Sequence, residues 1–223
     1  MAFTNSSLVD YKKISPNKTS PRNHAIDTIT IHCVVGQASV ETLGNLFAQS
    51  SRQASSNYGI GVDGRIGMYV EEKDRSWCSS NAANDHRAIT IECASDATEP
   101  YAVNDKVFDS LVKLLVDICK RNDIKELKWS TEKADRVNHR NGCNMTVHRD
   151  YANKSCPGEY LYDRHGEIAE EVNKQLKGSG GTNDVIYRVQ IGAFSKKENA
   201  ERQLKKAKAA GFTDAFITEV KKK

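Results

Sequence analysis

Three side chains with nitrogen or sulfur donors stand where they could bind one metal ion. His148 and Cys156 lie eight residues apart in the loop-like segment VHRDYANKSCPGEY, and His32 lies within the alternating segment DTITIHCVV. Zinc favours imidazole and thiolate ligands, whereas calcium and magnesium prefer oxygen. Three such ligands with an open fourth position are typical of catalytic zinc. The spacing leaves an alternative open, in which the cysteine is buried and the histidines only form hydrogen bonds.

Two charged side chains fit the other needs of metal-assisted hydrolysis. Glu92 lies in a second alternating segment, AITIECA, and Lys154 stands two residues before Cys156. Amide hydrolysis by a zinc-activated water needs a base for the water proton and a cation for the developing oxyanion. Glu92 suits the first role and Lys154 the second. Without the three donors nearby, they would be a hydrogen-bonded strand carboxylate and a solvated loop lysine.

The elements that must position these residues follow from periodicity. In residues 27–35 and 88–94, apolar side chains occupy one face of a strand, and polar side chains, including His32 and Glu92, occupy the other. We therefore expect neighbouring strands whose polar faces share a pocket, and a hairpin within residues 57–70. Helices are predicted over three segments: 39–49, 105–122 and 160–176. Strands interleaved with helices indicate an α/β fold with a central mixed sheet flanked by helices.

A Gly/Ser-rich segment, residues 178–183, predicts a linker between a main domain (1–177) and a short tail (184–223). The tail has ten Lys/Arg against five Asp/Glu, a net charge of +5, whereas the preceding residues have a net charge of −1. A basic tail suits nucleic acid, an anionic polymer such as a bacterial wall, or simply a solvated helix face. Its pattern predicts a small β-α-β module, with Ser195 and Glu198 as a capping box and Gly211 as the helix stop.

Composition excludes several classes of protein. No apolar run approaches the ~20 residues of a membrane span, and the start of the chain has neither the basic nor the apolar region of a secretory signal. We expect a protein that is made in the cytoplasm and does not insert into a membrane. The six cysteines are scattered and include no C-x-x-C pair, so reduced thiols are expected and a zinc finger is not.

Four separated blocks, in order, resemble the zinc-dependent N-acetylmuramoyl-L-alanine amidases of the type-2 amidase family, and phage endolysins of Gram-positive, clostridia-like hosts in particular. These blocks are TIHCVVGQ, SSNYGIGVDGRIGMYV, SWCSSNAANDHRAITIECAS and MTVHRDYANKSCPG, and the likeness covers residues 20–175. The resemblance implies that His32, His148 and Cys156 bind zinc, and it assigns catalytic roles to Glu92 and Lys154. The family and the residue chemistry thus select the same five residues.

The resemblance also implies a substrate and a groove. The substrate would be peptidoglycan, cut between N-acetylmuramic acid and the L-alanine of the stem peptide during phage-induced lysis after release by a holin. The residues expected at the substrate groove are Trp77, Asn84, His86 and Asn57. Some phage members carry an active-site tyrosine where this chain has Ser56, and Tyr58 is expected on a different face. This departure leaves Glu92 as the preferred base.

Alternatives remain within and outside the family. The same family fold includes peptidoglycan recognition proteins, some of which have lost the cysteine ligand that this chain keeps and only bind the wall. Two further alternatives are an amidase that recycles muropeptides and an unrelated protein with a structural zinc ion. The tail resembles the sporulation-related (SPOR) repeat, which binds peptidoglycan, but only half a repeat is present, so a homodimer or docking on the main domain is expected. With this assignment, peptidoglycan is the expected partner and nucleic acid is not. The remaining histidines expected at the surface are His24, His139 and His165.

Overall fold

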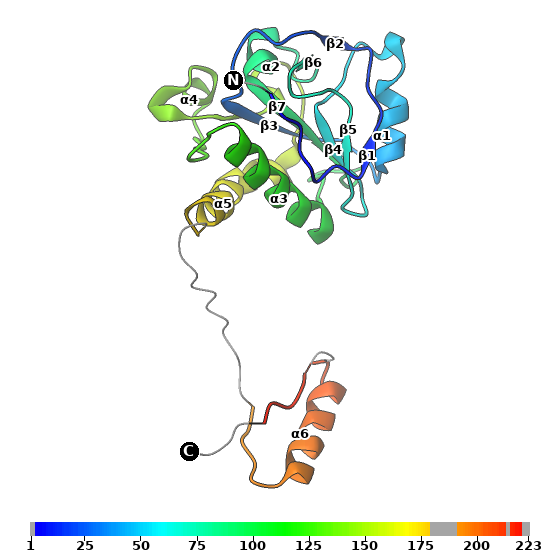
Figure 1. The fold of residues 1–223 in the computed structure, drawn as a ribbon, viewed down its shortest axis with the longest axis vertical. Coiled ribbons are helices and arrows are strands. Elements are labelled where there is room, and N and C mark those ends of the chain that lie inside the picture. The colour runs from blue at the N-terminus through cyan, green and yellow to red at the C-terminus, as the bar shows by residue number, and fades with distance from the viewer. Residues whose placement is uncertain (1–2, 179–190, 213–214, 220–223) are drawn as a thin grey trace. The chain divides into compact units, whose positions relative to one another are not determined.

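The computed structural model describes residues 3–178, 191–212 and 215–219. The chain divides into two compact units, Met1–Gly181 and Thr182–Lys223, and the division falls inside the Gly/Ser-rich segment. Figure 1 shows the larger unit with its sheet and helices, and the smaller one around α6. No helix of the described residues is long and apolar enough to cross a membrane.

A six-stranded mixed sheet forms the centre of the larger unit, as the sequence predicts. Its strand order is β1-β5-β4-β7-β3-β8, and the β4/β5 pair, the predicted hairpin, is antiparallel while the other pairs are parallel. A separate antiparallel pair joins β2 and β6. The strands are β1 (Tyr11–Lys12), β2 (Lys18–Thr19), β3 (Thr28–Cys33), β4 (Tyr58–Ile60), β5 (Ile66–Met68), β6 (Arg75–Ser76), β7 (Ala88–Cys93) and β8 (Met145–Thr146).

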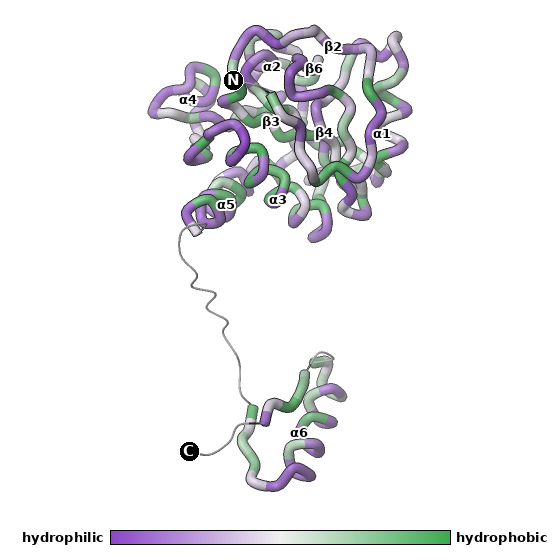
Figure 2. Tube along the Cα trace, viewed as in Figure 1, coloured by the Kyte–Doolittle hydropathy of each residue, from purple (hydrophilic) through white to green (hydrophobic). Residues whose placement is uncertain are grey.

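Helices lie on and around this sheet (Figure 1). The three predicted helices are present with nearly the predicted bounds. The elements are α1 (Val40–Phe47), α2 (Ala82–Arg87), α3 (Asp105–Arg121), α4 (Lys133–Val137) and α5 (Gly158–Lys177), with short 3₁₀ turns η1 (Ser50–Arg52), η2 (Arg140–Gly142) and η3 (His148–Asp150). The Asn104 side chain caps α3 by accepting a hydrogen bond from the Val107 backbone N–H. Along α3, hydrophobic and hydrophilic residues alternate in Figure 2, as a helix with one buried face requires.

One face of the central sheet carries the apolar core. Ile29 and Ile31 of β3 and the corresponding isoleucines of β7 are fully buried in one cluster with the apolar side chains of α3 and α5. Such burial is the main favourable contribution to folding, at roughly 25 cal/mol per Å² of apolar surface. The period-two pattern of these strands therefore fixes which face packs against the helices.

The opposite face of β3 and β7 is polar but also buried. All six residues of β3 are buried, and on β7 only Glu92 is partly exposed. The Asn84 side chain of α2 lies at its centre, where it donates to Thr30 Oγ1 at 3.0 Å and accepts from Thr146 Oγ1 at 2.9 Å and from Tyr151 Oη at 3.1 Å. A buried polar group is tolerated when its hydrogen bonds are made, and here they are made across three elements. The site lies at the end of this polar layer.

The smaller unit differs from its predicted pattern. Helix α6 (Lys197–Ala209) is present, and Gly211 follows it with a φ of +99°, which fits the predicted stop. The predicted capping box is wrong: Lys196 is the N-cap residue, and no side chain caps the helix. The two strands of the predicted β-α-β pattern cover residues 185–195 and 212–220. They are not formed at the described residues 191–195, 212 and 215–219, and the rest of those segments lies outside the described residues.

Candidate metal and catalytic site

The structure brings together the three predicted metal ligands. Candidate ligand atoms of His32, His148 and Cys156 all lie within 4.8 Å of one another. Cys156 Sγ is 3.4 Å from His32 Nδ1, and the rings of His32 and His148 meet edge to face with their centroids 5.1 Å apart. His32 comes from β3, His148 from η3, and Cys156 from the loop before α5. Residues distant in the sequence therefore form one cluster.

A buried ion pair anchors the segment that carries His148. Asp150, the last residue of η3, accepts two hydrogen bonds from the guanidinium of Arg136 in α4, at 2.9 and 2.6 Å. Both side chains are almost completely buried, and Arg136 also donates to the backbone carbonyls of Ser130 and Thr131. Paired, bidentate hydrogen bonds of this kind are strong and directional. They hold His148 close to β3.

The three residues fit a zinc ion in their chemistry. Burial lowers the pKa of His32 well below its ordinary value, and burial and the charge of Lys154 lower that of His148, so both rings are held in the neutral form that binds metals. A hydrogen bond with Cys33 and burial raise the pKa of the Cys156 thiol, whose proton a bound cation would displace. Two imidazoles and a thiolate form a donor set typical of zinc.

Glu92 lies beside this cluster, directly opposite His32 in the parallel pairing of β3 and β7. Its Oε1 is 3.8 Å from Cys78 Sγ, and its buried Oε2 has no hydrogen-bond partner in the described part of the chain. Burial raises the pKa of Glu92 to about 8, against smaller lowering effects of Cys78 and Arg52. A carboxyl group with a pKa near neutrality, next to candidate metal ligands, is suited to taking up and releasing protons.

Lys154 is exposed at the rim of the cluster. Its charge acts on His148, and its ammonium group forms no ion pair with any residue that the structure describes. The side chain is therefore able to turn towards a substrate.

The predicted groove residues occupy different environments. Trp77 is half-buried and donates from Nε1 to Thr19 Oγ1 at 3.0 Å, and His86, also half-buried, accepts from the Asn23 backbone N–H at 3.0 Å. Asn84 and Asn57, by contrast, are buried, which corrects their expected position at the surface of a groove. The side chain of Asn57 is used internally by Thr90 and by backbone carbonyls. Both amides connect strands and are not exposed to a substrate.

Two further expectations concern aromatic and histidine side chains. Tyr58 is fully buried in the apolar core and donates to Glu72 Oε1 at 2.7 Å, so it lies away from Glu92, as predicted. His165 is not at the surface: it is fully buried, its ring lies 4.4 Å from that of Trp129, and its Nδ1 is 2.6 Å from the Leu161 carbonyl oxygen. The expectation for His165 is wrong because this side chain lies on the inner face of α5.

Sequence reasoning missed two contacts of the loop between β6 and α2. Ser80 Oγ is 3.0 Å from His148 Nε2, and Cys78 contacts the carboxylate of Glu92. The carboxylate of Asp85 accepts from the backbone N–H groups of Cys78 and Ser79 and thereby shapes this loop. Cys78 and Glu92 belong to the same sequence block, but this proximity in the sequence does not predict the contact between their side chains.

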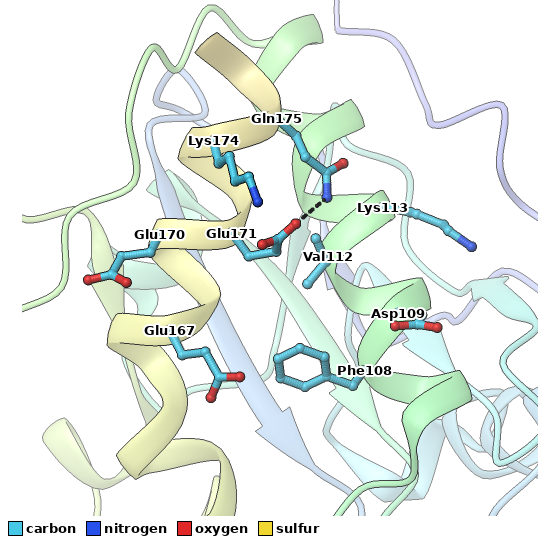
Figure 3. A pocket seen from close by; sticks show the side chains of 9 residues that line it. All are labelled: Phe108, Asp109, Val112, Lys113, Glu167, Glu170, Glu171, Lys174 and Gln175. Carbon is cyan, nitrogen blue, oxygen red and sulfur yellow. Dashed lines mark hydrogen bonds between the residues drawn. The ribbon is translucent and has the colours of Figure 1, made fainter. Parts of the chain in front are cut away.

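A pocket of about 680 Å³ lies elsewhere, between α3 and α5. Figure 3 shows Phe108 and Val112 of α3 facing charged side chains of α5, among them Glu167 and Lys174. None of the residues discussed above lines it. The candidate site is therefore separate from this pocket, and its chemistry lies on the other face of the sheet.

Comparisons with known proteins agree with this geometry. Residues 22–159 match the family model described as N-acetylmuramoyl-L-alanine amidase, and residues 169–223, which begin within α5, match the SPOR domain. A search of curated proteins finds no match.

Solved structures with the same fold have low sequence identity to this chain. PlyL is 17% identical with a TM-score of 0.53 (77% of this chain, 97% of that chain), and a selenomethionine derivative of AmpD is 17% identical with a TM-score of 0.54 (76% and 99%). The endolysin amidase LysCS from Clostridium intestinale is 17% identical with a TM-score of 0.54 (77% and 99%). Since the family model spans more than half of the residues, the chain belongs to the N-acetylmuramoyl-L-alanine amidase family.

Proposed function

We propose that this protein is a zinc-dependent peptidoglycan amidase that cuts the bond between the lactyl group of N-acetylmuramic acid and the L-alanine of the stem peptide. The observation that carries the proposal is the convergence of His32, His148 and Cys156 beside Glu92, whose Oε2 is buried. The chain belongs to the amidase family, which supports the reaction class. The donor set supports zinc as the metal.

Each residue has a defined part in the proposed reaction. His32, His148 and Cys156 would hold a zinc ion, which supplies Lewis acidity towards the scissile carbonyl and a water molecule. The ionised Glu92 takes the proton of the attacking water and returns it to the nitrogen of the leaving alanine. Lys154 approaches from the rim and stabilises the oxyanion of the tetrahedral intermediate. The elevated pKa of Glu92 supports both proton transfers.

The biological setting is proposed on the same basis. Two of the solved structures with this fold are described as endolysins, which supports a role in phage-induced lysis of a Gram-positive host. The match of residues 169–223 to the SPOR domain supports peptidoglycan binding by the tail. Synthesis in the cytoplasm, holin-dependent release and pairing of two tails in a homodimer stay predictions.

Digestion of purified Gram-positive peptidoglycan by the zinc-loaded protein tests the proposal. We expect new N-terminal alanine without new reducing sugar ends. Glu92→Gln should lower the rate by about 10²- to 10⁴-fold, since it removes the proton acceptor. A chelator should abolish the reaction, and zinc should restore it. Wall binding without new termini of either kind would instead identify a recognition protein and overturn the catalytic assignments.

A further inference from the structure

A second set of candidate metal ligands overlaps the first at His32. Ligand atoms of His32, Cys78 and Glu92 also lie within 4.8 Å of one another. Cys78 Sγ is 3.8 Å from Glu92 Oε1, and the three residues come from β3, the loop after β6, and β7. None of the roles discussed above requires a thiol at residue 78.

Two atoms of this second set are unsatisfied. His32 Nε2 and Glu92 Oε2 are both buried, and neither has a hydrogen-bond partner among the residues that the structure describes. Buried polar atoms normally have a partner, and an exception calls for an explanation such as an ion. Imidazole, thiolate and carboxylate are all zinc ligands. At zinc–ligand distances of roughly 2.0–2.3 Å, tetrahedral donors lie roughly 3.5 Å apart, so small side-chain rotations would close the set.

The loop that carries Cys78 is firmly held. The backbone N–H of Cys78 donates to Asp85 Oδ2 at 3.0 Å, and that of the preceding Trp77 donates to Ser55 Oγ at 3.1 Å. Cys78 as a whole residue is half-buried. These two backbone hydrogen bonds hold the residue beside Glu92.

A divalent cation would have two anionic donors at this position. The thiolate of Cys78 and the carboxylate of Glu92 would supply two negative charges to it, and its binding would displace the protons of both groups.

We propose that His32, Cys78 and Glu92 form a second position for a soft divalent cation such as zinc. An ion there occupies the carboxylate of Glu92 and competes for His32, so zinc in excess inhibits the amidase. The inhibition rests on the role proposed above for Glu92, whereas the binding of the ion does not.

Cobalt(II), which takes the place of zinc and absorbs when a thiolate binds it, separates the two positions. Cys156→Ser removes the thiol of the first set, so its remaining thiolate-to-cobalt absorption should come from Cys78. The double variant Cys156→Ser/Cys78→Ser should lose that absorption, and Cys119→Ser, a buried cysteine of α3, should absorb like the unsubstituted protein. Circular dichroism establishes that each variant is folded. If Cys156→Ser does not fold, the unsubstituted protein and Cys78→Ser are compared instead. The second equivalent of cobalt should then add thiolate absorption in the unsubstituted protein and none in Cys78→Ser.

A zinc titration supplies the second readout. For each protein, the rate of wall hydrolysis in excess zinc is divided by the rate of the same protein at one equivalent of zinc. Cys78→Ser should need at least tenfold more zinc for half-inhibition than the unsubstituted protein. Absence of thiolate absorption in folded Cys156→Ser, or its persistence in the double variant, would overturn the second position. Loss of cobalt binding at the first equivalent in the unsubstituted protein would instead contradict the first set and the proposed function.

Discussion

At the scale of single residues, the exposed ammonium group of Lys154 separates binding from catalysis. Lys154 lies at the rim beside His148 and is not a metal ligand. Lys154→Met should lower kcat by about 10²-fold, because a cation near the oxyanion acts mainly in the transition state, and KM and zinc content should change little. Lys174→Met, an exposed lysine of α5, is the matched control. An unchanged kcat in Lys154→Met would remove this residue from the mechanism.

A second residue, His165, makes stability depend on pH. Burial lowers the pKa of His165 to about 4, below its ordinary value of 6.5, so the unfolded chain takes up a proton that the folded chain excludes. The stabilising contribution is complete above pH 6.5 and is lost as the pH falls towards 4, by about 3 kcal/mol over the whole window. Urea unfolding across this range should show the fall, and His165→Phe should lack that part of it. An equal pH dependence of the free energy of unfolding in the unsubstituted protein and in His165→Phe would contradict a lowered pKa of His165. His24→Gln, at an exposed histidine, is the control.

At the scale of elements, the buried amide of Asn84 ties α2 to β3 and β8. Its side chain exchanges hydrogen bonds with Thr30, Thr146 and Tyr151 in the polar layer under the site. Asn84→Ala should lower the free energy of unfolding by about 2–4 kcal/mol, because several buried groups lose their partner at once. Asn45→Ala, at an exposed position in α1, should stay within about 0.5 kcal/mol of the unsubstituted protein. Chemical denaturation measures the free energy of unfolding of both variants. If Asn84→Ala lost as little free energy of unfolding as Asn45→Ala, the stabilising role of Asn84 in the polar layer would be contradicted.

Elements with strong periodicity could be predicted from the sequence, and the partners of single side chains could not. The alternation in β3 and β7 correctly placed His32 and Glu92 on one shared face, because a strand has only two faces. It did not show that this face is buried, since burial depends on α2 and on loops distant in the sequence. Asn84 was misplaced for that reason.

His165 is a different case, because the sequence did contain a signal for its burial. In α5 the buried residues Leu161, His165, Ile168 and Val172 recur at intervals of three or four, the spacing of one helix face. The prediction of a helix over residues 160–176 nevertheless placed this histidine at the surface. Cys78 had no such signal, since its contact with Glu92 is purely tertiary.

At the scale of the whole molecule, the two units should contribute separately to activity. The candidate metal ligands lie entirely within the first unit, and the second carries the cationic helix α6. A protein of residues 1–181 should therefore cleave a soluble muropeptide with the same kcat/KM as the full chain. On intact wall fragments at low salt it should be at least roughly tenfold slower, because a linked binding module raises the local concentration of the enzyme.

The dependence on salt distinguishes how the second unit acts on the wall. Exposed charges are screened within roughly 10 Å at 0.1 M salt, so attraction between the basic tail and an anionic wall should weaken as salt rises. The advantage of the full chain over residues 1–181 should then shrink across a salt titration of wall hydrolysis. An advantage that persists at high salt would favour recognition of the glycan by uncharged contacts. Equal rates at every salt concentration would contradict a wall-binding role, and slower cleavage of the soluble muropeptide by the shortened protein would show that the units are not independent.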